Sequence, residues 1–148
     1  MKLSKKGQYA LRAVFELSSR NHNEPVKTYD IARSQRISPR FTEVILNELK
    51  HGGFVESIRG NVGGYLLARS PDKITIKEVI EYIEGPVSFS QEKSKNSRND
   101  IVFGDNAFAE LWKEIDEAVS DILHGKTFKD LINSEIKQRK MQPLNYNI

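Results

Sequence analysis

The sequence of 148 residues predicts a mainly α-helical fold that contains one small β-hairpin, and three observations support this class. Apolar residues recur at three- and four-residue intervals in several stretches, which indicates amphipathic helices. Two short apolar stretches between residues 54 and 68 flank a glycine-rich turn, which is typical of a hairpin. An apolar stripe from residue 106 to residue 124 predicts one long helix in the C-terminal part.

The first predicted helix runs from Leu3 to Ser19, and its lysines and Arg12 lie on a basic side. A polar break follows it. A second, short helix is predicted from Lys27 to Gln35, with Thr28 as its N-terminal cap. The apolar residues of these two helices that can face a core are Leu11, Val14, Phe15, Leu17, Ile31 and Ala32.

The third predicted helix runs from Pro39 to His51. Ser38 can accept hydrogen bonds from the amides of its first turn, and proline suits the first helical position. Gly52 is expected to be the left-handed residue that ends the helix. The residues that can face a core are Phe41, Val44, Ile45 and Leu49. The residues expected to project away from that core are Arg40, Thr42, Glu43, Asn47 and Lys50.

The hairpin is predicted directly after the third helix. Its strands run from Phe54 to Ile58 and from Tyr65 to Ala68, and Gly60 to Gly64 supplies the tight turn. Arg59 is therefore expected at the tip of the hairpin. A helix, a short turn, a second helix and then a hairpin form the pattern of a winged helix-turn-helix, a fold that commonly binds DNA.

A capping box at Thr75 and Glu78 predicts a further helix that ends at Gly85–Pro86. From Val87 to Asp105 the composition changes to mainly polar residues, which predicts a loop or linker. The expected organisation is a DNA-binding domain at residues 1–86, a polar loop at residues 87–105 and a C-terminal part at residues 106–148.

In the C-terminal part, the long helix is predicted from Asn106 to His124, before Gly125. A short helix follows from Thr127 and Asp130, and the residues from Lys137 to Ile148 are expected to fray. The apolar stripe of the long helix can belong to the core of its own chain, but it is wider than one small domain needs. We therefore expect it to pack against the same helix of a second chain, through Phe108, Leu111, Trp112, Ile115, Val119 and Ile122.

Charge is distributed unevenly along the chain. Residues 1–72 carry 12 lysines or arginines against 7 acidic residues, whereas residues 73–148 carry 11 against 13. The basic part coincides with the predicted helix and hairpin, as expected for a protein that binds the phosphates of double-stranded DNA. Charge alone is equally compatible with a solvated lysine-rich surface. No apolar run approaches the length of a membrane span or a signal-peptide core, so we expect a cytoplasmic protein without membrane contact.

The composition excludes several kinds of chemistry. The chain contains no cysteine, which excludes disulfides, thiolate catalysis and cysteine-bound iron–sulfur clusters. Its three histidines, His22, His51 and His124, lie far apart without ligand spacing, so no metal site is expected. No pairing of a nucleophile with a base and no phosphate-binding GxxxxGK[ST] loop is present. We therefore expect neither an enzyme nor a cofactor.

Four segments carry a resemblance to a known family: MKLSKKGQYALRAVFELS, DIARSQRISPRF, LKHGGFVESIRGNVGGYLLAR and ITIKEVIEYIEGP. Together they resemble the bacterial Rrf2 family of regulators, which includes IscR, NsrR and CymR. The resemblance implies a homodimer with one winged helix-turn-helix in each subunit, joined through the long C-terminal helix. It also implies binding to a palindromic operator, most often as a repressor.

The resemblance assigns expected DNA contacts. Glu43 matches a position that can accept a hydrogen bond from a cytosine amine in the major groove, and Arg59 matches a wing arginine that enters the minor groove. Gly60, Gly63 and Gly64 either let the wing approach DNA closely or simply build the hairpin. The contacts expected from the third helix are made by Ser38, Arg40, Phe41, Thr42 and Glu43.

One departure from the family bears on regulation. Cluster-binding members carry three cysteines soon after the EGP motif, and this chain has none. It therefore resembles the CymR-like branch, in which an effector metabolite or a regulatory protein controls binding, and the loop from Val87 to Asp105 is the candidate region for such control. Two alternatives remain open: an iron–sulfur-sensing regulator whose cysteines are absent or replaced in this chain, and a winged helix that contacts only proteins.

Overall fold

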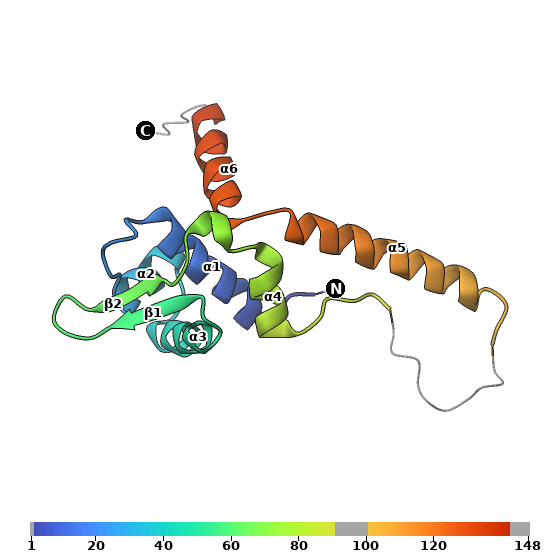
Figure 1. The fold of residues 1–148 in the computed structure, drawn as a ribbon, viewed down its shortest axis with the longest axis horizontal. Helices are drawn as coiled ribbons and strands as arrows, with labels where there is room; N and C mark the ends of the chain where they lie inside the picture. The colour runs from blue at the N-terminus through green and yellow to red at the C-terminus, as the bar shows by residue number, and fades with distance from the viewer. Residues whose placement is uncertain (1, 91–100, 143–148) are drawn as a thin grey trace, which may run out of the picture.

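The computed structural model describes residues 2–90 and 101–142, which form six α-helices, one short 3-10 turn and a two-stranded antiparallel sheet. The predicted class, mainly helical with a hairpin wing, is confirmed. Helices α1 to α4 and the hairpin form a winged domain, from which α5 projects (Figure 1). The elements are α1 (Lys5–Ser19), α2 (Thr28–Gln35), α3 (Pro39–His51), β1 (Val55–Ile58), β2 (Gly64–Leu67), η1 (Pro71–Lys73), α4 (Ile76–Glu84), α5 (Asp105–His124) and α6 (Phe128–Met141).

Helix α1 lies at the centre of the winged domain. It contacts α2, α3, α4, α6 and β2, and its N-terminus is capped by the Ser4 hydroxyl, which accepts a hydrogen bond from the amide of Gly7 at 3.0 Å. The hydrophobic core consists mainly of buried side chains of α1, α3 and α4. From these helices it contains Ala10, Ala13, Val14, Leu17, Ile45, Leu46, Leu49, Ile76, Val79 and Ile80.

The hairpin is supported on a second edge. The backbone of Val26 pairs with that of Tyr65 through two hydrogen bonds of 2.8 and 2.9 Å, on the edge of β2 that β1 does not use. A side chain at Gly64 would collide with the carbonyl of Val26, and one at Gly63 would collide with the carbonyl of Ile58. Close backbone packing therefore requires both glycines, Gly63 within the hairpin and Gly64 between the hairpin and Val26.

Helix α5 is built differently from the other helices, because none of its residues is buried. It is the longest helix. Even so, neither α5 nor any other helix within residues 2–90 and 101–142 combines the length and apolar character needed to cross a membrane.

The chain returns to the winged domain after α5. Residues 126–128 pair with residues 74–76, since the amide of Ile76 donates to the carbonyl of Lys126 at 2.9 Å and the amide of Phe128 donates to that of Ile74 at 3.1 Å. The Phe128 side chain is fully buried and belongs to the same core as α1. This docking fixes the junction between α5 and α6.

Asp116 of α5 provides a second link. Its carboxylate accepts hydrogen bonds from the Ser88 and Ser90 hydroxyls, each at 2.8 Å, and from the amide of Phe89. The bond from the Phe89 amide, with help from the two serines, holds the pKa of Asp116 below its usual value. The segment that leaves α4 is therefore attached to the middle of α5. Residues 91–100 of the predicted polar loop lie outside the described residues.

Two predicted helix ends were wrong. Thr28 is the first residue of α2 rather than its cap, and Lys27 at the cap position makes no side-chain hydrogen bond to the helix. Gly52 has a φ of −78°, so it is not left-handed; the left-handed residue is Gly53, with a φ of 77°. The chain therefore turns one residue later than predicted.

The C-terminal helix is longer than predicted. Helix α6 continues to Met141, so the expected fraying from Lys137 is wrong up to that residue. A complete capping box at Thr127 and Asp130 starts the helix, and its last turns consist mainly of residues with good helix propensity. Residues 143–148 lie outside the described residues.

We predict that Phe128→Ala lowers the free energy of unfolding by about 3–5 kcal/mol, because it leaves a cavity in the core. Urea denaturation followed by circular dichroism measures this loss. Ile136→Ala on the same helix is a matched control, since Ile136 is 48% exposed and its loss should cost less than about 0.5 kcal/mol. Equal effects of the two changes would contradict the role of Phe128 as the anchor of α6.

Candidate DNA-binding surface

Helices α2 and α3 form a helix-turn-helix. Arg36 ends α2 in the left-handed conformation, with a φ of 55°, and the amide of Ile37 then donates to the carbonyl of Ala32 at 2.9 Å. The buried Ile37 fixes the turn against the core. Ser38 starts α3 as predicted, since its hydroxyl accepts a hydrogen bond from the amide of Phe41 at 3.2 Å.

One face of α3 is exposed, and it carries Arg40, Glu43, Val44 and Asn47. These positions are spaced by three, one and three residues, which places them on one side of a helix. The opposite side is buried and carries Thr42, Ile45, Leu46 and Leu49. We call the exposed group the outer stripe of α3.

Two side chains of α3 point opposite to the prediction. Thr42, expected on the outside as a DNA contact, is fully buried, and its hydroxyl donates to the carbonyl of Ser38 at 2.9 Å. Val44, expected in the core, is 52% exposed. A threonine can be buried at low cost when a backbone carbonyl accepts a hydrogen bond from its hydroxyl group. The predicted outward orientation of the Thr42 side chain was therefore wrong, and this side chain is not exposed for a DNA contact in this structure.

The remaining predicted contacts on α3 are distributed differently. Ser38, Arg40 and Glu43 are exposed, whereas Phe41 is half-buried. The ring of Phe41 packs edge-on against that of Tyr9 from α1, with 5.5 Å between ring centroids. Phe41 therefore serves mainly to attach α3 to α1.

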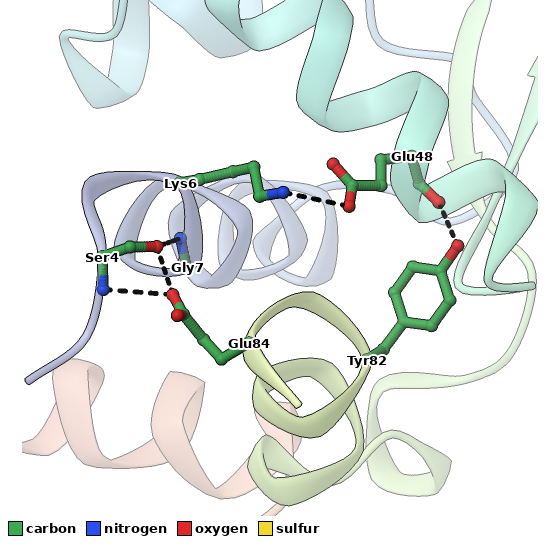
Figure 2. Close-up of polar contacts among 6 residues, drawn as sticks. All are labelled: Ser4, Lys6, Gly7, Glu48, Tyr82 and Glu84. Atoms are coloured by element: carbon green, nitrogen blue, oxygen red, sulfur yellow. Dashed lines mark hydrogen bonds and ion pairs between the residues drawn. The ribbon is translucent and has the colours of Figure 1, made fainter. Parts of the chain in front are cut away.

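Polar contacts fix the C-terminal half of α3 (Figure 2). Lys6 Nζ of α1 lies 3.2 Å from a carboxylate oxygen of Glu48, and the Tyr82 hydroxyl of α4 donates to the backbone carbonyl of Glu48 at 3.0 Å. At the end of α4, Glu84 accepts hydrogen bonds from the amide and hydroxyl of Ser4. Helices α1, α3 and α4 are thus tied together near the N-terminus of α1.

A buried carboxylate fixes α2. Glu16 of α1 is 6% exposed and accepts hydrogen bonds from Arg20 Nε at 2.8 Å and Gln35 Nε2 at 2.7 Å. Burial raises the pKa of Glu16, but the hydrogen bonds from Gln35, Ser34 and Arg20 outweigh this effect, and the pKa lies below its usual value. The ionised carboxylate therefore holds the last residue of α2 immediately before the turn.

The wing presents a second exposed group. Arg59 directly follows β1 and is exposed, and Gly60 has a φ of 116° with open space around its Cα. Val62, at the same turn, is 84% exposed. Several exposed cations lie on or near the turn, α3 and the wing. Within the described parts of the chain they form no ion pair. These cations are Lys27, Arg33, Arg36, Arg40, Lys50 and Arg59.

The side chains present do not fit a cysteine-bound cluster. The whole chain lacks cysteine, and residues 2–90 and 101–142 contain no group of three histidine, aspartate or glutamate side chains placed to hold a metal ion. His51, one of the three histidines, instead lies with Nδ1 2.7 Å from the carbonyl of Asn47.

We predict that Glu16→Gln lowers the free energy of unfolding at pH 7 by about 1–3 kcal/mol, because glutamine has one acceptor oxygen in place of two and its NH2 group would face one of the two part-buried donors, Arg20 and Gln35. The folded-state pKa of Glu16 is depressed below the reference value of 4.5, so its contribution is present above that pH and is lost as the pH falls through the folded-state pKa. Urea denaturation between pH 7 and pH 3 should therefore show the two proteins converging. A difference that stays constant over this range would contradict the assignment.

Comparison with known proteins supports this architecture. The model of the Rrf2 family, described as an iron-dependent transcriptional regulator, matches residues 3–134. The transcriptional regulator CymR of Bacillus subtilis is 34% identical over 131 residues, covering 88% of this chain and 89% of CymR. IscR of Erwinia tasmaniensis is 32% identical over 136 residues, covering 91% of this chain and 81% of that protein.

Solved structures agree with the sequence matches. The structure of CymR, the global cysteine regulator of B. subtilis, superposes with a TM-score of 0.78, covering 90% of this chain and 98% of that one. The structure of IscR from T. potens gives a TM-score of 0.76 at 27% identity, covering 99% and 96%. Because the family model spans most of the chain and the relatives are matched over at least 81% of their own length, this protein belongs to the Rrf2 family of transcriptional regulators.

Proposed function

We propose that this protein is a transcriptional repressor that binds a palindromic operator as a homodimer. The observation that carries the proposal is the outer stripe of α3, which is exposed and mostly polar and has exposed cations near it that form no ion pair within residues 2–90 and 101–142. Its relatives CymR and IscR are HTH-type transcriptional regulators. Cationic side chains around a protruding helix provide the phosphate contacts that position such a helix on DNA.

The proposed contacts divide between the two grooves. Helix α3 enters the major groove, where Arg40 and Glu43 can reach base edges; a carboxylate there accepts a hydrogen bond from a cytosine amine. Arg59 of the wing enters the minor groove, whose negative potential is strongest where AT-rich sequence narrows it. The open space around Gly60 suits a close approach to the sugar-phosphate backbone, whereas Gly63 and Gly64 already have a role in close backbone packing.

The proposed dimer contact is α5. No residue of the helix is fully buried within its own chain. Leu123 packs partly against the core, but Phe108, Leu111 and Ile122 are 58%, 44% and 64% exposed. Phe108 also stacks on Trp112, with 6.2 Å between ring centroids. A second copy of α5 would cover this surface, which also includes Ile115 and Val119. Two-fold symmetry of the protein would then match a palindromic site.

We propose that a small molecule or a partner protein controls binding, rather than a cysteine-bound cluster. The family is described as iron-dependent, but the donor set of this chain does not fit that group. An iron–sulfur sensor would need ligands that this polypeptide lacks. The comparison with CymR, described as a global cysteine regulator, supports a signal of another kind.

We expect Arg59→Ala to weaken operator binding by about 1–3 kcal/mol without unfolding the protein. Binding is measured by fluorescence anisotropy on a duplex first selected from genomic fragments by the purified protein. Arg139→Ala is a control with the same change in charge, since Arg139 lies on α6, away from the wing and α3, and pairs with Glu135; it should change affinity far less. If the wild-type protein enriches no sequence, either the proposed effector is missing from the assay or the chain acts through protein contacts instead.

We expect Ile115→Lys to convert the dimer to a monomer, because a charge would then be placed inside an apolar interface. Light scattering coupled to size exclusion at micromolar concentration gives the mass directly. Glu117→Lys introduces the same side chain on the polar side of α5 and should leave the dimer intact. A monomeric wild-type protein would refute the proposed role of α5.

A further inference from the structure

The outer stripe of α3 contains one side chain that cannot form hydrogen bonds. Val44 is 52% exposed and lies between three polar residues, one turn after Arg40, next to Glu43 and three residues before Asn47. Single exposed apolar side chains are common on protein surfaces. This one, however, occupies the centre of the surface proposed to face the bases.

The chemistry of the major groove restricts what Val44 can contact there. Base edges present hydrogen-bond donors and acceptors together with one apolar group, the C5-methyl group of thymine. A valine opposite a donor or acceptor would displace water without replacing its hydrogen bonds. A valine opposite the thymine methyl group removes apolar surface from water on both sides.

The position of Val44 is fixed in advance of binding. A β-branched side chain in a helix has one strongly preferred rotamer, so it loses little conformational freedom on contact. Its neighbours Ile45 and Leu46 are fully buried, and Glu48, one turn later, is bound by Lys6 and Tyr82. The backbone that carries Val44 is therefore held from the opposite side.

The length of the outer stripe determines which base pairs its residues can reach. From Arg40 to Asn47 the helix advances by about 10 Å, which corresponds to about three base-pair steps along DNA. Val44 is near the middle of this span and adjacent to Glu43. The base pair that it meets therefore lies next to the one that Glu43 contacts.

We propose that Val44 is a specificity-determining residue that packs against the C5-methyl group of a thymine, so that each operator half-site carries a T·A pair beside the base pair contacted by Glu43. This inference rests on the proposed DNA-binding function. It adds a base preference that hydrogen bonding alone does not provide.

The test uses the full-length protein and a duplex selected from a random DNA library. Each thymine of the selected half-site is replaced in turn by deoxyuridine, which removes only the methyl group. At one thymine per half-site, we expect about a fourfold loss of affinity per contact, the effect of one methyl-sized apolar group. Val44→Ala should cause a similar loss on the thymine duplex and almost none on the matching deoxyuridine duplex, because the two changes remove the same contact.

Val62→Ala is the matched control. It makes the same chemical change at an exposed valine of the wing, which is proposed to face the minor groove, where thymine displays no methyl group. The deoxyuridine penalty should therefore persist in Val62→Ala and disappear only in Val44→Ala. An unchanged urea denaturation curve would show that Val44→Ala keeps its fold.

The outcomes separate this inference from the function on which it rests. Two results would overturn the role of Val44 and leave the proposed regulator intact. One is specific binding in which the losses from Val44→Ala and from deoxyuridine add. The other is a selected half-site that contains no thymine. Selection of no preferred sequence, by the purified protein and again in a cell extract that supplies effectors and partner proteins, would refute the proposed function, and the role of Val44 with it.

Discussion

Each of the other helices of the winged domain packs against α1, and this crowding is the constraint that shapes the rest of the structure. Helices approach one another closely only where small side chains line the crossing. The buried side of α1 accordingly carries Gly7, Ala10 and Ala13, and a side chain at Gly7 would collide with the carboxylate of Glu84. Because α1 contacts both helices of the helix-turn-helix, its packing fixes where α3 is presented.

The sequence predicted helices where local chemistry decides them. The Ser38 cap of α3 and the capping box at Thr75 and Glu78 formed as expected, because each depends only on residues within one turn. The rotation of α3 about its axis was not predictable in the same way. Hydropathy places Val44 inside and Thr42 outside, whereas the structure does the opposite. Packing against α1 determines which side of α3 is buried. The Ser38 carbonyl accepts a hydrogen bond from the Thr42 hydroxyl and so offsets the cost of burying that group.

Contacts between distant segments could not be predicted from the sequence either. Nothing local indicates that residues 126–128 pair with residues 74–76, or that Asp116 binds the segment after α4. For the candidate site, the exposed positions of Arg40, Glu43 and Arg59 could be anticipated from periodicity and turn chemistry. The central position of Val44 in the outer stripe could not be anticipated, because it depends on which side of α3 is buried.

The way in which α5 is attached has a consequence for how such a protein could evolve. The helix is joined to its own winged domain by contacts with α4, by the docking of Phe128 directly after it and by the bonds of Asp116 to residues 88–90. In the proposed dimer, these contacts and the crossing of the two α5 helices set the distance between the two copies of α3. Preference for a base sequence and preference for a spacing between half-sites would then reside in separate parts of the chain. Substitutions in α3 could change the first, and substitutions at the α5 contacts the second, each without disturbing the other.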